Sequence, residues 1–316
     1  MNLHLKYSNL LILLSTIFFT CSSRIVDHSN NSDILSSLST APDTVPQVFA
    51  KGIISTERVR EGAITFSPDM KVIYFTSMDS TTRVRIMEMK YSNGSWTQPI
   101  EWEHSNLGNN HEPFVTPNGR NLYFVSNRHA PDVKGSGRIW MTSRINAQWN
   151  APRMLFDVKS DKGLWFPSVS AKGTLFFGGY LDSLGCYGKS DIYSYSLNGN
   201  EGQIKNLGEV INSPFEEWDP YIAPDESYLL FESDRPGGYG AVDIYISFKE
   251  EGRWSQPINL GPTINTSAYE VAARVSPDGK YLFFDRPFKT EQDIHWVSSA
   301  VIEKLRVKFR NSKAGL

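Results

Sequence analysis

The most telling stretch of the sequence reads Ser276-Pro277-Asp278-Gly279-Lys280-Tyr281-Leu282-Phe283-Phe284. Variants of this phrase begin at four earlier positions, Ser67, Thr116, Ser170 and Ala223. Aligned on the second residue of the phrase, at positions 68, 117, 171, 224 and 277, the copies are 49, 54, 53 and 53 residues apart. A spacing this regular indicates one supersecondary unit that is repeated along the chain.

Each copy carries the signals of four short strands. Proline followed by Asp or Asn, often with Gly, is hairpin-turn chemistry, and here it joins a short strand to a nearly all-apolar one. A third strand follows, and a Trp-x-x-Pro pattern at Trp96, Trp149 and Trp254 marks a fourth. The third copy has residues 202–207 in place of that pattern. Four antiparallel strands per repeat of this length predict the blade of a β-propeller.

The fifth copy ends after its third strand, near Val301, and leaves its fourth strand unaccounted for. Residues 46–55 resemble residues 257–265, which leave the fourth copy. We therefore expect the N-terminal strand to complete the last blade and close the ring, since closure removes unpaired sheet edges. The predicted fold is all-β: a five-bladed β-propeller of four-stranded antiparallel blades over residues 46–306.

The repeat resembles a known family. The Ser-Pro-Asp-Gly-Lys-x-Leu-x-Phe phrase at 276–284, Ser-Asp-Arg at 233–235 and Asp-Ile-Tyr at 243–245 are similar to the TolB-type, WD-like propeller repeat. The resemblance covers roughly residues 46–306 and implies a fold, because this repeat occurs in proteins with many roles. The α/β domain that precedes the propeller in TolB has no counterpart here, so TolB's partner contacts are not carried over.

The N-terminus predicts export and lipid anchoring. Residues 1–20 combine Lys6 with an apolar run from Leu10 to Phe19, which is shorter than the ~20 residues that span a bilayer and fits a signal peptide. Cys21 follows this run directly, as in a lipoprotein that is cleaved before a lipidated cysteine. The alternative is an ordinary secretory signal with an incidental cysteine. Both interpretations place the mature protein outside the cytoplasm.

The remaining segments give a four-part organisation. Residues 21–45 hold the lipidated cysteine and a flexible tether rich in Ser, Asn and Asp, and residues 307–316 form a basic C-terminal tail. We expect a monomeric propeller in the bacterial cell envelope, held by its N-terminal lipid on the periplasmic or surface side of the outer membrane. With Cys21 lipidated, Cys186 is the single thiol left and no disulfide forms. The net charge of −2 gives no support to a nucleic-acid partner.

The strand order separates two faces of the expected propeller. The Pro-Asp-Gly turns and the third-to-fourth turns are short and lie on one face. The second-to-third loops, such as residues 127–137, 179–189 and 234–240, are long and lie with the blade-to-blade connections on the other. Long loops on one face of a rigid scaffold are where binding usually occurs. We call this second face the loop-rich face.

The blade-to-blade connections bring acids and aromatic residues to the entries of the innermost strands. We expect them around the mouth of the central channel. A first aligned column holds Glu61, Asn110, Glu217 and Glu270. A second holds His111, Trp165 and Trp218, and a third holds Glu112 and Asp219.

Three interpretations of these columns stay open. Acids at strand entries cap backbone N–H groups or pair with Arg, and Trp packs between blades. Carboxylates beside aromatic rings also bind sugars or proteins. A carboxylate pair at suitable separation hydrolyses glycosidic bonds, for which Glu112, Glu217 and Asp219 are the candidates.

Other kinds of site have no support in the sequence. The six histidines show no metal-ligand spacing, and neither a nucleophile elbow nor a phosphate-binding loop is present. We therefore expect no metal and no cofactor. The favoured function is a non-enzymatic binding protein or scaffold whose loop-rich face takes an envelope protein or glycan. The alternative is a polysaccharide-active enzyme, either a glycoside hydrolase or a lyase.

Overall fold

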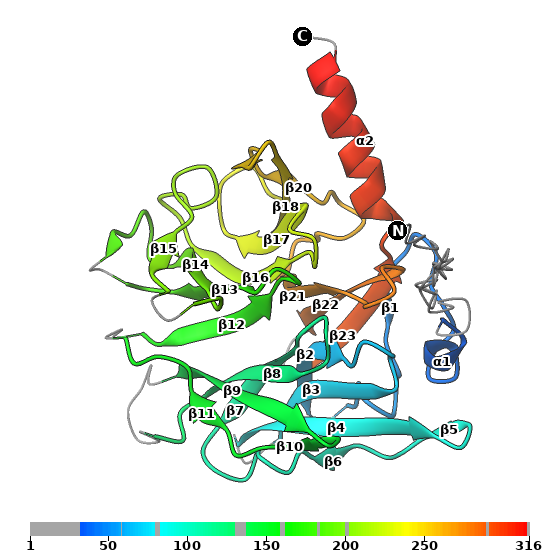
Figure 1. Cartoon of the computed structure of the whole chain (residues 1–316). Helices are drawn as coiled ribbons and strands as arrows, with labels where there is room; N and C mark the ends of the chain where they lie inside the picture. The colour runs from blue at the N-terminus through cyan, green and yellow to red at the C-terminus, as the bar shows by residue number, and fades with distance from the viewer. Residues whose placement is uncertain are drawn as a thin grey trace, which may run out of the picture.

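Antiparallel strands make up most of the molecule. The computed structural model describes residues 32–314 except 58, 80–82, 130–136, 159–161, 182–183, 200–201 and 289–290. We divide the strands into five groups, numbered in chain order, in each of which the first three strands pair consecutively. Figure 1 shows these groups following one another around the middle of the molecule. The chain thus has a β-propeller fold of several small antiparallel sheets, as the repeat predicted.

The strands of the first three groups have the following bounds. Group 1 contains β2 (Arg60–Phe66), β3 (Val72–Met78), β4 (Val84–Ser92), β5 (Ser95–Trp96) and β6 (Ile100–Glu101). Group 2 contains β7 (Asn110–Val115), β8 (Asn121–Ser126), β9 (Arg138–Ile145), β10 (Gln148–Trp149) and β11 (Arg153–Met154). Group 3 contains β12 (Leu164–Val169), β13 (Thr174–Gly179), β14 (Asp191–Ser196) and β15 (Ile204–Asn206).

The last two groups complete the set. Group 4 contains β16 (Glu217–Ile222), β17 (Tyr228–Ser233), β18 (Asp243–Glu250), β19 (Arg253–Trp254) and β20 (Ile258–Asn259). Group 5 contains β21 (Val271–Val275), β22 (Tyr281–Phe288) and β23 (Glu291–Ser298). Its outer strand comes from the other end of the chain, because β1 (Gln47–Val48) pairs antiparallel with β23. A parallel bridge between Arg60 and Gln292 links groups 5 and 1.

The Trp-x-x-Pro pattern divides the outer strand of three groups into two short pieces. In group 1, β5 and β6 both pair with β4, one on each side of the interruption before Pro99. Groups 2 and 4 repeat this arrangement around Pro152 and Pro257. Proline has no N–H to donate to a sheet, so it stands where the ladder breaks. Group 3, which lacks the pattern, has the single strand β15.

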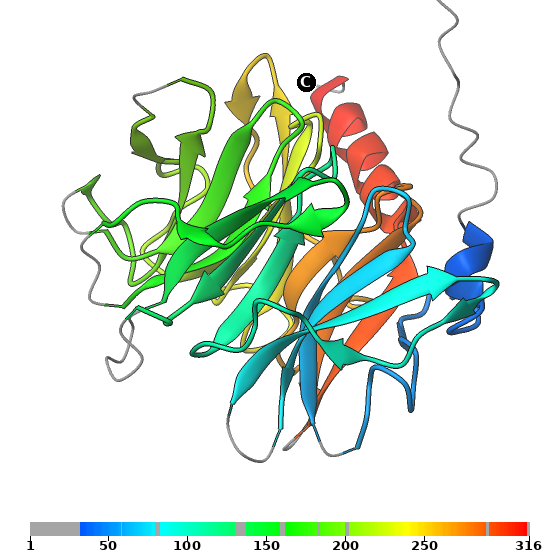
Figure 2. The same cartoon turned by 60° about the horizontal axis from the view of Figure 1, so that its bottom comes forward.

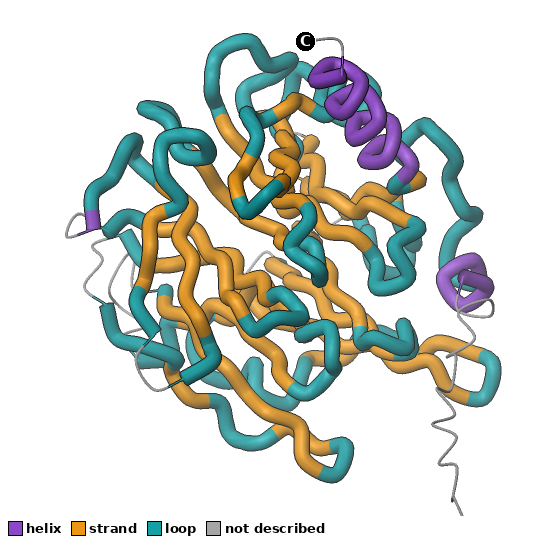
Figure 3. The backbone as a smooth tube through the Cα atoms, turned by 45° about the horizontal axis from the view of Figure 1, so that its top comes forward, coloured by secondary structure: helices purple, strands orange, loops and turns teal. Residues whose placement is uncertain are grey.

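The C-terminal segment differs from the predicted tail. Residues Ala300–Ala314 form helix α2, on the outside of the strands in Figure 3. Ile302 is buried in the main core, and the ring of Phe309 stacks on that of Phe248 with centroids 5.5 Å apart. The boundary predicted at residue 307 therefore falls inside a helix, because the apolar residues of this segment recur at helical spacing and cover the sheet.

The described part of the predicted tether also packs on the sheets. Helix α1 (Ser32–Ser36) lies beside the β4–β5 hairpin, as Figure 2 shows. Leu35 is fully buried in a core cluster with Phe49 and Phe283, and the indole of Trp96 donates to the carbonyl of Ile34 at 3.2 Å. The α1 segment of the predicted tether is therefore packed against the sheets. No helix of the described chain is long and apolar enough to cross a bilayer.

Candidate functional site

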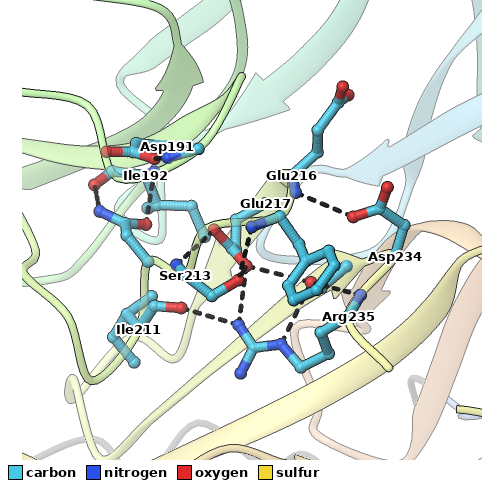
Figure 4. Close-up of polar contacts among 12 residues, drawn as sticks. Asp191, Ile192, Ile211, Ser213, Glu216, Glu217, Asp234 and Arg235 are labelled. Carbon is cyan, nitrogen blue, oxygen red and sulfur yellow. Dashed lines mark hydrogen bonds and ion pairs between the residues drawn. The ribbon is translucent and has the colours of Figure 1, made fainter. Parts of the chain in front are cut away.

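Two of the predicted mouth acids hold the scaffold together. Glu217 is fully buried and accepts hydrogen bonds from the N–H of Ser213 at 2.9 Å and from Arg235 at 2.9 Å (Figure 4). The same Arg235 nitrogen donates to the carbonyl of Ile211 at 2.8 Å. Glu270 repeats the arrangement with Thr266 and Arg286, both at 2.9 Å. Each acid therefore closes the connection between two groups.

The other two members of this column have the same role. Asn110 accepts from Arg128 at 2.7 Å, and its amide donates to three carbonyls of the preceding loop. Glu61 accepts from the Thr56 hydroxyl at 2.8 Å. All four side chains are buried, and of the four Glu61 alone also lines the pocket described below. Glu217, a candidate catalytic residue, is not among the residues that line that pocket.

The first strand of every group carries a bulge. Its ladder with the second strand shifts register in each group. One residue at each shift has a positive φ, a region that non-glycine residues rarely adopt. These residues and angles are Ala63 (50°), Glu112 (56°), Phe166 (51°), Asp219 (48°) and Ala272 (61°). The bulge turns backbone N–H groups away from the ladder, and they need other acceptors.

Side chains of the neighbouring group supply those acceptors. Phe166 N–H donates to Glu112 at 2.7 Å, and Ala63 N–H donates to Asp285 at 2.9 Å. Ala273 N–H donates to Glu232 at 3.0 Å in the same way. The first bond joins two first strands, and the other two join a first strand to the second strand of the neighbouring group. Part of the acidity of the channel is therefore structural.

Arg274 lies among these acids with its charge unmatched by direct contacts. It is buried between the rings of Phe114 and Phe166, 5.1 and 4.8 Å from their centroids. Within the described residues, its three guanidinium nitrogens have no hydrogen-bond partner, and neither has one carboxyl oxygen of Glu232 or of Asp285. Buried polar atoms without partners are uncommon, and water or a ligand usually satisfies them.

Burial changes the protonation of this cluster. It raises the pKa of Asp285 to about 8, and it raises the pKa values of Asp219 and Glu232 well above their ordinary range. Neighbouring carboxylates add to the effect on Asp219 and Glu232. Burial also lowers the pKa of Arg274 to about 10. The raised pKa values favour the protonated forms of these acids, and a protonated carboxyl both donates and accepts hydrogen bonds.

A pocket of about 300 Å³ opens above the cluster on the loop-rich face. His111, Glu112 and Asp219 line it together with Phe166, Asp285 and Gln292. The His111 imidazole lies 2.9 Å from the Glu112 carboxylate. Burial lowers the pKa of His111, but Glu112 outweighs it, so the net pKa is raised. Four predicted site residues, Glu61, His111, Glu112 and Asp219, therefore meet in one pocket.

The other end of the channel is also hollow. A cavity of about 260 Å³ is lined by Pro68, Pro117, Pro224 and Pro277 of the repeated turns, with Arg274 at its inner end. The sequence predicted nothing on this face beyond short turns. Arg274 lines this apolar cavity, and its charge also acts on Asp219 and Asp285, which line the acidic pocket.

The two predicted tryptophans contribute packing. Trp165 has a buried indole nitrogen, and a side chain at Gly178 would meet it, since a Cβ there would lie 2.4 Å away. Gly178 therefore leaves room for this ring. Trp218 is half-buried in β16, opposite Glu232. Neither lines the acidic pocket.

Sequence reasoning missed Arg274, Glu232, Asp285 and Gln292. A readable signal existed for two of them, because Glu232 and Asp285 each follow the aromatic end of an apolar strand, where a charge is unusual. Among the described residues, no group of three His, Cys, Asp or Glu side chains is placed to hold a metal ion. The predicted lipidation residue, Cys21, lies outside the described residues.

Comparison with solved structures finds the same fold in TolB proteins. A putative TolB from Agrobacterium tumefaciens is similar with a TM-score of 0.52 and 15% identity, over 77% of this chain and 78% of that chain. TolB from Acinetobacter baumannii is similar with a TM-score of 0.50 and 16% identity, over 76% of this chain and 52% of that chain. At these identities the likeness establishes a TolB-like propeller fold alone.

A weaker likeness links the chain to an α-L-arabinofuranosidase from Podospora anserina, solved in complex with cellotriose. The TM-score is 0.49 and the identity 9%, over 81% of this chain and 97% of that chain. No protein-family model matches the sequence, and no curated protein matches it significantly.

Proposed function

We propose that this chain is a lipid-anchored envelope protein that binds a protein or glycan at the channel mouth of its loop-rich face. In this proposal the five groups are the five blades of a closed propeller. Residues 1–20 are a signal peptide, and Cys21 carries the lipid. The binding protein is a monomer and needs no cofactor.

Contacts between first strands support the five-bladed ring. β2 contacts β7, β7 contacts β12, β12 contacts β16, β16 contacts β21, and β21 contacts β2. The pairing of β1 with β23 gives group 5 the outer strand that the other groups have from their own sequence. A closed ring of five first strands accounts for the contacts. A last blade built from both ends of the chain accounts for the pairing of β1 with β23.

The acidic pocket carries the proposal for binding. Its walls combine a hydrogen-bonded His111–Glu112 pair, carboxyls with raised pKa values and the edge of a cluster whose buried polar atoms lack partners among the described residues. The scaffold keeps these groups in place without a ligand, because the bulges and the buried Glu217–Arg235 and Glu270–Arg286 pairs fix the strands. Preorganised polar groups of this kind give a small number of oriented hydrogen bonds to a ligand.

Exposed aromatic residues on the same face support a large ligand. Tyr187 and Tyr239 occupy corresponding positions in the β13–β14 and β17–β18 loops, where each backbone N–H is held by Asp191 or Asp243. Phe215 and Tyr269 stand exposed in the following connections. Aromatic residues held on rigid loops are enriched where proteins bind proteins and glycans.

A second candidate is a polysaccharide-active enzyme. Its support is the pocket itself, where Glu112 and Asp219 lie close enough for Glu112 to raise the pKa of Asp219. A protonated Asp219 is the general acid of this alternative, and Glu112 is the base or nucleophile, with His111 beside it. Glycosidases use such a pair of carboxyls with separated pKa values.

The test uses the mature chain from residue 22 on glycan arrays and in pull-downs from envelope extracts. We expect Asp219→Asn and Glu112→Gln to abolish retention of the ligand found with the wild type. Glu303→Gln, on an exposed residue of α2, is the control and retains it. Retention by both pocket variants contradicts the channel-mouth site. Shortened glycan products that appear with the wild type and not with Asp219→Asn favour the enzyme.

Localisation has a separate test. The full precursor carrying Cys21→Ser is expected in the soluble fraction, whereas the wild type is expected in the membrane fraction. A membrane-bound Cys21→Ser protein contradicts lipid anchoring and leaves the binding proposal unaffected.

A further inference from the structure

A tryptophan from the outer hairpin of one group joins it to the group before. The indole of Trp149 in group 2 donates a hydrogen bond to the hydroxyl of Tyr74 in group 1 at 2.9 Å. In the corresponding place, Trp254 of group 4 packs edge-on against Phe176 of group 3, with centroids 6.4 Å apart. Trp96 of group 1 packs against the cluster that contains Phe283 of group 5.

Helix α2 takes this role between groups 4 and 5, where group 5 has no such tryptophan. Ile302 lies in the same buried cluster as Leu230, which corresponds to Tyr74 in the repeat. Arg306 lies over the ring of Phe248 at 4.8 Å, and Phe309 stacks on that ring. Four of the five junctions between groups are thus filled by side chains of the described chain.

The junction between groups 2 and 3 is different. Group 3 lacks the Trp-x-x-Pro pattern, and a cavity of about 780 Å³ lies between the two groups on the Pro-turn face. Tyr123, which corresponds to Tyr74, borders this cavity, and Tyr195 lies opposite. We call it the 2–3 cleft. It is several times larger than one indole ring, so a tryptophan and its flanking residues fit together.

The walls of the 2–3 cleft are polar and basic. The Tyr123 hydroxyl has no hydrogen-bond partner in the described structure, because Met141 stands where Glu88 accepts from Tyr74 at 2.8 Å. Arg153 and Lys172 line the cleft, and the described lining residues include no carboxylate. The asparagines of the lining are Asn118, Asn121 and Asn198.

The two cations are not equally available. Lys172 lies 3.8 Å from Glu226, which Lys249 approaches more closely, at 3.2 Å. Arg153 is exposed in the short strand β11, and the described chain gives it no ion pair within 4.0 Å. Arg153 is also near Tyr123, since its charge opposes the rise to about 12 that burial causes in the pKa of that phenol. Arg153 is therefore the main anion-binding group of the cleft.

We propose that the 2–3 cleft binds an acidic peptide segment of another protein, with a tryptophan of that segment in the place that Trp149 occupies one junction earlier. Its indole N–H donates to Tyr123, as Trp149 donates to Tyr74. Its neighbouring carboxylates pair with Arg153 and Lys172. The ligand thus supplies the ring and the negative charge that the described lining of this junction does not provide. The site lies on the face opposite the acidic pocket and is independent of the proposed function.

The direct test is titration of the mature chain with the tripeptide acetyl-Asp-Trp-Glu-amide, followed by calorimetry and amide chemical shifts. We expect saturable binding that weakens at least about tenfold in Arg153→Gln, in line with loss of a charge-assisted hydrogen bond. A smaller loss, about threefold to tenfold, is expected in Tyr123→Phe, which removes a neutral hydrogen bond. Replacing the peptide's Trp by Ala, or its acids by amides, is expected to abolish binding.

The matched control is Lys205→Gln. Lys205 has the register position of Arg153 in group 3, but Trp254 fills the junction beside it. We expect Lys205→Gln to bind the tripeptide as the wild type does. An equal loss in both charge variants, or unchanged binding in Arg153→Gln, overturns the proposal. So does failure of the wild type to bind the peptide, or displacement of the peptide by neutral oligosaccharides with greater affinity.

Discussion

The guanidinium of Arg235 and the carboxylate of Glu217 lie 2.9 Å apart, and the same arginine nitrogen reaches the carbonyl of Ile211 at 2.8 Å. Glu217 is fully buried, and Arg235 lies over the rings of Phe231 and Tyr245. The pair therefore joins a connection between two groups to the strands of group 4. A residue that the sequence suggested for ligand binding instead stabilises the fold.

Glu217→Ala should lower the free energy of unfolding by about 3–5 kcal/mol, because it leaves the largely buried cation of Arg235 without its carboxylate partner. Urea unfolding measures this loss. Glu216→Ala is the adjacent control, since Glu216 makes a loose surface pair with Lys189 at 3.7 Å, and it should change stability by less than about 0.5 kcal/mol. A Glu217→Ala protein as stable as the control contradicts the structural role.

Asp285 should make stability depend on pH. A carboxyl of an unfolded chain titrates near ~3.9, whereas burial raises the pKa of Asp285 to about 8. The folded state binds the extra proton between these values, so stability should fall as pH rises through this window, by up to about 1.4 kcal/mol per pH unit. Asp219 and Glu232 add slopes of the same sign. In Asp285→Asn, the free energy of unfolding measured with urea should decline less steeply between about pH 5 and about pH 8.

Asp225→Asn controls for the general effect of losing a carboxylate. Burial raises the pKa of Asp225, but hydrogen bonds from Ser227 outweigh it, so its net pKa is lowered. A lowered pKa affects stability only under acidic conditions, so this variant should leave the slope near neutral pH unchanged. A slope that stays the same in Asp285→Asn would show that Asp285 is already ionised.

Trp149→Phe should cost about 1 kcal/mol of stability beyond the lost packing area, since it removes the hydrogen bond to the Tyr74 hydroxyl. A double-mutant cycle with Tyr74→Phe isolates that coupling. Trp254→Phe is the comparison, because its ring packs on Phe176, which has no hydroxyl group. Equal unfolding free energies for both tryptophan variants contradict a distinct role for the hydrogen bond.

Phe309→Ala should destabilise the protein by about 1–2 kcal/mol, because the half-buried ring of α2 loses its stacking on Phe248. Val307→Ala, on the exposed side of the same helix, should cost less than about 0.5 kcal/mol. The melting temperatures of the two variants test whether this helix is packed on the sheet. If the segment were a solvated tail, both substitutions would lower the melting temperature by the same small amount.

The repeat predicted the turns and strands well, because hairpin chemistry is local. Pro68, Pro117, Pro224 and Pro277 all stand in the turns between first and second strands. Helix α2 was missed, although Val301, Ile302, Leu305 and Phe309 have helical spacing. The segment carries many charges, and only the sheet beneath it makes the apolar face visible.

The site was only partly predictable for a geometric reason. Alignment of the repeats placed His111, Glu112 and Asp219 near the mouth, and the structure does bring them together. The alignment could not show that a bulge turns the N–H of Ala63 toward Asp285, which is 222 residues away in the sequence. Burial of the first column was equally invisible, since an acid that binds a ligand and an acid that binds Arg look alike in a repeat.

The ladder between β1 and β23 has a consequence for biosynthesis. Gln47 pairs with Trp296, and about 250 residues must be synthesised between them. At about 5–20 residues per second, this strand waits on the order of 12–50 s for its partner. Until then β1 has no partner strand, and its backbone hydrogen-bonding groups stay unpaired. The N-terminal strand of the growing chain therefore needs protection from aggregation until synthesis is nearly complete, whereas N-terminal segments generally fold first during synthesis.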